Sequence, residues 1–141
     1  MELLCDRVEG TLAAYRNELV TRSEDNIDDQ IARFSLLFNL CLWFHDCIYD
    51  PRSQDNELQS VVVFEEFAEA VDLNGDDRML VTQVIKDTIS HKRTSGLDDN
   101  QVYLDLSAYF LDADLSLLCA DDSTYDDYAE RIWREYEFVG R

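Results

Sequence analysis

The chain has 141 residues, of which 46% are hydrophobic, and 31 acidic against 12 basic residues give a formal net charge of -19. A single domain of this length buries roughly 68–70% of its unfolded surface, which is enough for a core without disulfide bonds. The hydrophobic content excludes a disordered chain. The acidic balance repels phosphates, which excludes a general binder of nucleic acid polymers or of acidic membrane surfaces.

The segments that mark export or metal clusters are absent from the sequence. The first ten residues carry charges, and no stretch approaches the roughly 20 apolar residues of a membrane span. The cysteines form no C-x-x-C pair, so a structural zinc cluster is not expected. They are Cys5, Cys41, Cys47 and Cys119. The sequence therefore predicts a reduced, cytoplasmic protein with one domain over residues 1–141.

Apolar residues recur at helical spacing, which predicts an all-α bundle of about six helices. The first helix is expected over residues 2–21, on the stripe Leu4, Val8, Leu12, Tyr15 and Leu19. The polar residues 23–26 separate it from a second helix. The stripe of that second helix is Ile31, Phe34, Phe38, Cys41, Leu42 and His45.

The second helix is expected to end near Tyr49, because Pro51 cannot continue a helix and biases Asp50 away from helical geometry. His45 and Asp46 would then lie in the last turn of a mostly buried helix, which also buries the preceding residues Leu42, Trp43 and Phe44.

The rest of the chain divides at turn residues. A third helix is predicted from after Ser53 or Asp55 to about Val71, followed by a turn around Gly75. The fourth and fifth are expected over residues 77–90 and 100–120, separated by a loop at 91–99. A last helix begins at residues 123–126, where Ser123 or Thr124 can cap it.

The pair His45-Asp46 follows an apolar run, where a carboxylate needs a positive partner. That partner is either His45 itself or a metal ion. Imidazole nitrogen and carboxylate oxygen together suit Zn, Mn, Fe, Co or Ni. The alternatives are a buried histidine hydrogen-bonded to an acid, or an Asp46 that points to water at a helix end.

Two further sites stand out in the second half of the chain. Asp112 and Asp114 interrupt an apolar helix, so they either need a cation or hydrogen bonds, or mark a helix boundary. His91, Lys92 and Arg93 form the most basic spot in the chain. They could receive a phosphate, or could be an exposed cluster of cations at a helix C-terminus.

Together these segments resemble one branch of the HD superfamily of predicted metal-dependent phosphohydrolases. WFHDCIYDPRSQDNELQS is similar to the branch pattern W-F-H-D-x-x-Y-D-P-x-x-x-D-N-E-x-x-S. TISHKR, LDADLSLLC and YAERIWREYEFV follow in the order of the branch's T-x-x-H, D-A-D-L-S-x-L-G and Y-x-x-x-I-R-x-E-Y blocks. The resemblance covers nearly the whole chain.

The resemblance implies an HD-domain-like helical bundle that binds a divalent transition metal (Mn, Co, Zn, Fe or Ni) through His45, Asp46 and Asp114. Asp112 would position a ligand or a water from the second shell. His91, with Lys92 or Arg93, would hold the phosphate of a small, nucleotide-like substrate. Glu57 and Asp50 are the candidate acid/base groups, with Glu57 preferred.

The chain departs from the branch in two places. The branch has an earlier Y-H-x-x-x-H-I segment whose histidine completes the metal shell, whereas no histidine precedes His45 here. That ligand is missing by a misplaced start, by truncation or by real loss, and we expect a chain that is truncated at its N-terminus relative to the branch. Some HD phosphatases carry a Glu three residues after the Asp, where this chain has Tyr49.

Two functions follow as alternatives. The first is metal-assisted hydrolysis of a small phosphate ester, with Asp114 or Glu57 taking the proton from a metal-bound water. The second is a non-catalytic helical module that has weak or no metal binding and serves as an interaction protein. An acidic decoy for basic proteins, based on the charge alone, ranks last. The sequence sets neither the metal nor the oligomeric state.

Overall fold

The structure is a computed structural model that describes residues 2–139, without the side chains of residues 2–7, which include Cys5, and of Leu117. The described residues form six α-helices and no strand, which confirms the all-α prediction. The helices are α1 (Glu2–Thr21), α2 (Ile27–Phe44), α3 (Asn56–Ala70), α4 (Gly75–Asp87), α5 (Gln101–Asp114) and α6 (Asp122–Glu135). Two short 3-10 helices follow α5 and α6: η1 (Leu115–Cys119) and η2 (Glu137–Val139).

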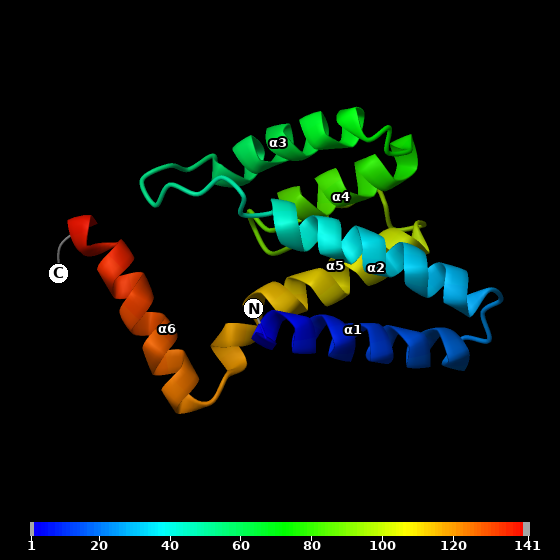
Figure 1. The fold of residues 1–141 in the computed structure, drawn as a ribbon, viewed down its shortest axis with the longest axis horizontal. Helices are drawn as coiled ribbons and strands as arrows, with labels where there is room; N and C mark the ends of the chain where they lie inside the picture. The colour runs from blue at the N-terminus through cyan, green and yellow to red at the C-terminus, as the bar shows by residue number, and fades with distance from the viewer. Residues whose placement is uncertain (1, 140–141) are drawn as a thin grey trace.

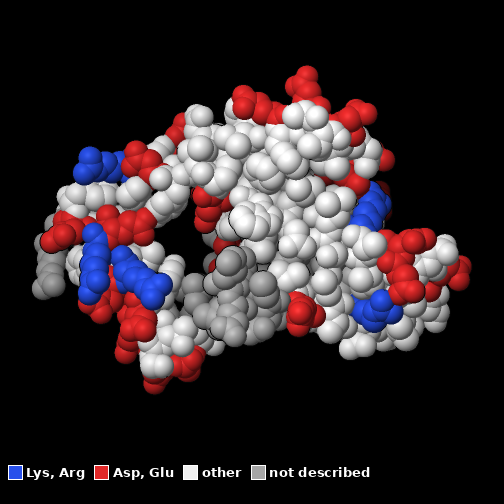
Figure 2. Space-filling view, viewed as in Figure 1, with Lys and Arg blue, Asp and Glu red and all other residues white. Residues whose placement is uncertain are grey.

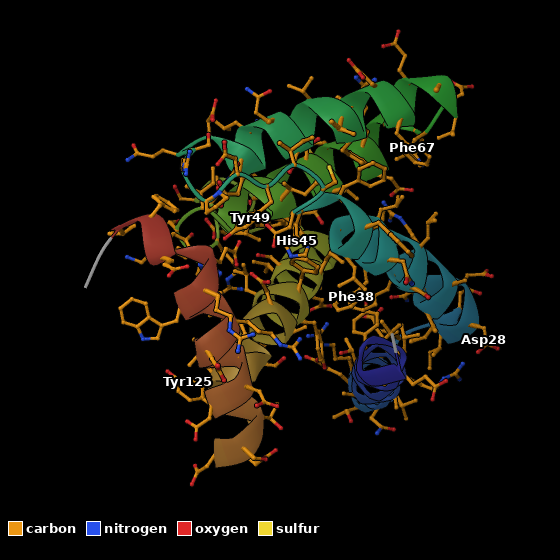
Figure 3. The ribbon with its side chains drawn as sticks, turned by 60° about the vertical axis from the view of Figure 1, so that its left-hand side comes forward. Asp28, Phe38, His45, Tyr49, Phe67 and Tyr125 are labelled. Atoms are coloured by element: carbon orange, nitrogen blue, oxygen red, sulfur yellow. The ribbon has the colours of Figure 1, made fainter. Side chains whose placement is uncertain are left out.

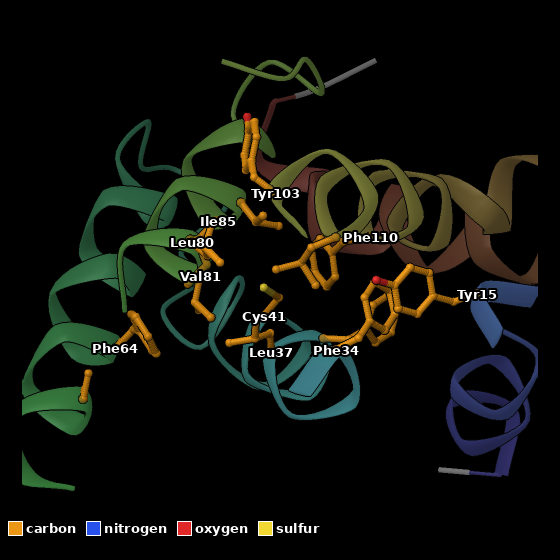
Figure 4. Packing of buried hydrophobic residues seen from close by; sticks show 14 of the residues in the cluster. Tyr15, Phe34, Leu37, Cys41, Phe64, Leu80, Val81, Ile85, Tyr103 and Phe110 are labelled. Atoms are coloured by element: carbon orange, nitrogen blue, oxygen red, sulfur yellow. The ribbon is translucent and has the colours of Figure 1, made fainter. Parts of the chain in front are cut away.

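Helix α2 lies at the centre of the fold, where it packs against α1, α3, α4 and α5 (Figure 1). Its buried side chains recur every three or four residues, so they form one stripe that faces the other helices. The core that these helices share is rich in aromatic rings (Figure 4). Its largest fully buried side chains are Tyr103, Phe34, Phe38, Phe64 and Phe110.

Helix α6 is an arm that stands away from this core (Figure 1). It packs mainly against η1, and none of its residues is buried. Its far end returns to the loop after α2, where the hydroxyl groups of Tyr49 and Tyr136 lie 3.2 Å apart and the Arg52 guanidinium lies 4.8 Å from the centre of the Phe138 ring. Figure 2 shows an opening between the arm and the body.

The end of α2 differs from the sequence prediction. The helix ends at Phe44 and not near Tyr49, so His45 caps it and Asp46 lies beyond it. Trp43, expected to be buried, is 71% exposed, because it lies off the buried stripe of Phe34, Leu37, Phe38 and Cys41. The helix stops early because the backbone of the next residues finds other hydrogen-bond partners, which are side chains of α3.

Four other helix boundaries differ from the prediction by a few residues. Gly75 begins α4 and is not the centre of a turn, since the Asn74 side chain accepts a hydrogen bond from the Asp77 N–H and caps the helix. Helix α4 ends at Asp87, before residue 90. Helix α5 ends at Asp114, and α6 is capped by Asp121, in place of Ser123 or Thr124.

A search of the described residues for a helix long and apolar enough to cross a lipid bilayer found none.

Candidate functional site

His45 lies where the C-terminal end of α2 meets α5 (Figure 3). The edge of its ring packs against Phe110, with 5.2 Å between the ring centres, and its side chain is 14% exposed. Its Nδ1 lies 3.2 Å from the carbonyl oxygen of Leu42, which can only accept, so Nδ1 carries a proton. This contact fixes the ring and turns Nε2 toward two carboxylates.

Those carboxylates come from two separate segments. Oδ2 of Asp46 lies 3.3 Å from Nε2 of His45, and Oδ1 of Asp114 lies 3.4 Å from the same nitrogen. The other oxygen of Asp114, Oδ2, lies 3.0 Å from Nε2 of His91. The structure therefore brings together the three ligands predicted from the sequence, and it adds His91 to the same group.

The backbone places each member of this group at an element boundary. Asp114 is the last residue of α5, as the helix-boundary interpretation expected, and its side chain is 23% exposed. Asp46 lies in a turn after α2 and its side chain is 57% exposed. His91 follows α4 in the left-handed region with φ of 50°, a conformation that costs a non-glycine residue roughly 1–2 kcal/mol. The Lys92 N–H closes this turn by donating to the Asp87 carbonyl.

The electrostatics of the group favour a protonated His45. Burial lowers the pKa of His45, but hydrogen bonds and charge from Asp114 and Asp46 outweigh burial and raise it to about 10. Burial raises the pKa of Asp114, but His45 and His91 outweigh that effect and hold it below its usual value. Without a metal, the imidazolium of His45 is itself the positive partner that the buried carboxylate needs.

The side chains of His45, Asp46 and Asp114 are of the right chemical type to bind a transition metal, but they are not positioned to bind one ion together. One imidazole nitrogen and two carboxylates are a suitable ligand set. Nε2 of His45 is the ring nitrogen that the backbone does not hold, so it is the one that could bind an ion. Among the described residues, however, no three His, Cys, Asp or Glu side chains are placed to hold one ion together. The contacts of His45 are pairwise, so an ion would require a carboxylate to move.

A groove of about 610 Å³ adjoins the group on the side of His91. The predicted phosphate ligands His91, Lys92 and Arg93 line it together with the acid Asp98, and neither Lys92 nor Arg93 forms an ion pair within residues 2–139. Asp112 also lines this groove, and its exposed carboxylate makes no hydrogen bond to the His45 group within the described chain. The structure thus gives Asp112 a place beside the basic residues, where the sequence predicted one beside the metal ligands.

The structure does not join the predicted acid/base groups to this cluster. Asp50 accepts a hydrogen bond from the Arg52 N–H at 2.9 Å, which is a local turn contact. Glu57 lies in the first turn of α3, half-buried, and in the described part of the chain its carboxylate makes neither a hydrogen bond nor an ion pair. Their catalytic role stays a prediction.

Two neighbours of these residues hold the loop, and the sequence reasoning missed both. The buried Asn56 side chain accepts from the Asp50 N–H and donates to the Asp50 carbonyl, both at 2.9 Å. Ser60 pairs in the same way with Ile48, at 3.1 and 3.3 Å. Both are polar residues on the buried stripe of α3 that continues to Phe64. A polar residue at a buried helical position needs a hydrogen-bond partner, and that was the sign in the sequence that could have identified them.

Comparison of the chain with protein-family models, with curated proteins and with solved structures found no match.

Proposed function

We propose that this chain is a metal-dependent phosphohydrolase with an HD-domain-like fold, acting on a small phosphate ester. The supporting observation is the position of His45 Nε2, which lies 3.3 and 3.4 Å from carboxylate oxygens of two separate segments while Nδ1 is held by the backbone. Two ligand atoms that are each about 2.1 Å from one ion lie about 3.0–3.4 Å apart. Each contact of His45 therefore has the length of an edge in a coordination shell.

In this proposal His45, Asp46 and Asp114 hold the ion. Asp46 is the residue that moves to complete the group, because its exposed side chain lies in a turn and has room to change rotamer. His91 holds Asp114 from the opposite side, through Oδ2, which fixes the direction of the remaining carboxylate oxygen. When bound, a divalent ion lowers the pKa of a water toward 7 and polarises a phosphoryl oxygen.

The basic end of the groove would receive the phosphate. Lys92 and Arg93 are free of ion pairs in the described chain, and they lie beside His91, which contacts Asp114. A phosphate held there would lie next to the carboxylate that carries the ion. Glu57 is the preferred acid/base group, with Asp50 and Asp114 as alternatives, and each would have to approach the attacking water to act.

The test is hydrolysis of p-nitrophenyl phosphate and of a panel of nucleoside monophosphates by the purified chain with added Mn²⁺ or Co²⁺. Activity should disappear in His45→Gln and in Asp114→Asn and persist in Asp126→Asn, an exposed acid of α6. Glu57→Gln should lower kcat, while Glu66→Gln, on the exposed side of the same helix, should not. Activity unchanged in His45→Gln would overturn the proposal.

The second candidate function, a non-catalytic helical module, has its own supporting observation. The described residues hold no ready group of three metal ligands, and a protonated His45 already satisfies both carboxylates. In that case the His45 group stabilises the junction of α2, α4 and α5 without a metal. Metal analysis separates the two: about one transition-metal ion per chain supports the enzyme, and none after incubation with Mn²⁺, Co²⁺ and Zn²⁺ supports the module.

A further inference from the structure

The loop that carries His91, Lys92 and Arg93 is tied at both ends to one residue, Asp87. Asp87 is the last residue of α4 and is 2% exposed. Its carbonyl accepts from the Lys92 N–H at 3.3 Å. Its carboxylate accepts from Thr94 twice, from the N–H at 3.2 Å and from the hydroxyl at 2.8 Å. The three basic residues therefore lie in a loop closed over this side chain.

Three donors from the body of the fold hold the carboxylate in place. The Tyr103 hydroxyl donates to Oδ2 at 2.5 Å and the Ser107 hydroxyl at 3.1 Å, both from the buried face of α5. The Gln83 side-chain amide donates to Oδ1 at 3.1 Å. Tyr103 also accepts from the Thr94 N–H at 2.8 Å, so the network joins α4, α5 and the loop. Figure 4 shows Tyr103 at the edge of the core.

All of these donors are neutral, which is unusual for a buried carboxylate. Leaving an ionised carboxylate unpaired in the interior is costly, and here hydrogen bonds alone offset that cost. The two cations of the loop, Lys92 and Arg93, are not used for this purpose; within residues 2–139 they pair with no acid and line the groove. Lys86, the residue before Asp87, has an exposed side chain. Asp87 therefore holds the loop in shape without neutralising the positive charges of Lys92 and Arg93.

We infer that Asp87 is a positioning residue: it holds residues 91–94 in the conformation that presents His91, Lys92 and Arg93 to the groove as an anion site. Because the loop also holds His91 in the left-handed region, loss of its anchor should release that residue to ordinary backbone angles. The inference rests on the proposed function only for the identity of the anion, a phosphate. The claim that Asp87 anchors the loop depends only on its hydrogen bonds to Lys92 and Thr94.

The variant that tests it is Asp87→Asn, whose amide NH₂ is a donor and cannot accept from all five partners. Asp76→Asn, an exposed acid in the first turn of the same helix, is the matched control. Thr94→Val is a second variant, which removes the hydroxyl that donates to Asp87 and accepts from the Gln83 amide and keeps the Thr94 N–H contact. Two readouts are measured on the full chain: amide hydrogen exchange by NMR, and affinity for inorganic phosphate by ³¹P line broadening.

In Asp87→Asn we expect the Lys92 and Thr94 amides to exchange at least about tenfold faster, while amides of α2 keep their protection. Phosphate affinity should fall about tenfold in Asp87→Asn, less in Thr94→Val, and not in Asp76→Asn. If Asp87→Asn unfolds, Thr94→Val decides by the same two readouts. Unchanged exchange at Lys92 and Thr94 in the folded variants would overturn the positioning role.

The two readouts also separate this inference from the proposed function. Faster loop exchange with no phosphate binding in any variant, the wild type included, keeps Asp87 as the anchor of the loop and contradicts the phosphate site. Faster loop exchange with unchanged phosphate affinity overturns the inference, because the loop conformation would then not matter for the anion.

Discussion

His45 and Asp114 meet at the junction of α2 and α5, where Nε2 of the first lies 3.4 Å from Oδ1 of the second. Helices α3 and α4 separate the two residues along the chain, so only the fold brings them together. The second oxygen of Asp114 faces His91, so one carboxylate joins the ends of three helices. The predictions below depend on this relationship and on the loops beside it.

The first prediction concerns the pH dependence of stability in the metal-free protein. The folded state raises the pKa of His45 from its ordinary value to about 10, so the folded protein binds this proton more tightly than the unfolded chain does. The stabilisation from the ion pair is complete below a pH of about 6.5, and it is lost as the pH rises through about 10.

Urea unfolding in EDTA checks this dependence. The difference in unfolding free energy between wild type and His45→Gln should be larger at about pH 6 than at about pH 9.5. A difference that stays constant or grows as the pH rises would contradict the assignment of the proton to His45. Asp126→Asn, far from any histidine contact in the described chain, should show no such trend.

A second prediction concerns the loop after α2. Asn56→Ala should lower the unfolding free energy by about 1–3 kcal/mol, because it leaves the N–H and the carbonyl of Asp50 without their partner. Gln59→Ala, in the same helix but exposed and bonded only to Asp55, should change it by less than about 0.5 kcal/mol. Chemical denaturation of both variants measures the difference. Equal effects would mean that the Asn56 clamp contributes nothing.

A third prediction concerns the basic end of the groove. If it holds the substrate phosphate, Arg93→Ala should raise KM about tenfold and leave kcat nearly unchanged, since the guanidinium binds ground state and transition state alike. Lys86→Ala removes an exposed cation from the last turn of α4 and should change neither constant. Steady-state kinetics with the best substrate of the panel provides the comparison. A fall in kcat without a change in KM would place Arg93 in the chemical step.

Periodicity predicted the helices because burial produces the spacing of apolar residues: helices α1 to α5 each place buried apolar side chains at that spacing. Helix α6 is the exception, since none of its residues is buried. The proximity of His45, Asp46 and Asp114 was expected only from the family resemblance, since carboxylate chemistry left other interpretations open for each residue. What the sequence did not predict depends on polar contacts between distant segments. Asn56 and Ser60 end α2 early by pairing with its extension, and no local rule contains that contact.

The role of Asp87 was missed for the same reason. It lies on the buried stripe of Leu80 and Val84, and its partners Tyr103 and Ser107 belong to the next helix. The exposure of Trp43 is a simpler case: it was assigned to the core because it lies in the apolar run with Leu42 and Phe44, but those two are only partly buried and Trp43 itself faces away from the core.

The last prediction tests the central claim, that the His45 group binds a divalent transition metal. Isothermal titration calorimetry with Mn²⁺ and Co²⁺ compares the chelator-treated wild type with Asp114→Asn and with the control Asp126→Asn. The account predicts one ion per chain for wild type and control, release of a proton from His45 on binding, and an affinity at least about 100-fold weaker in Asp114→Asn. No binding to the wild type, or equal binding to all three proteins, would contradict it.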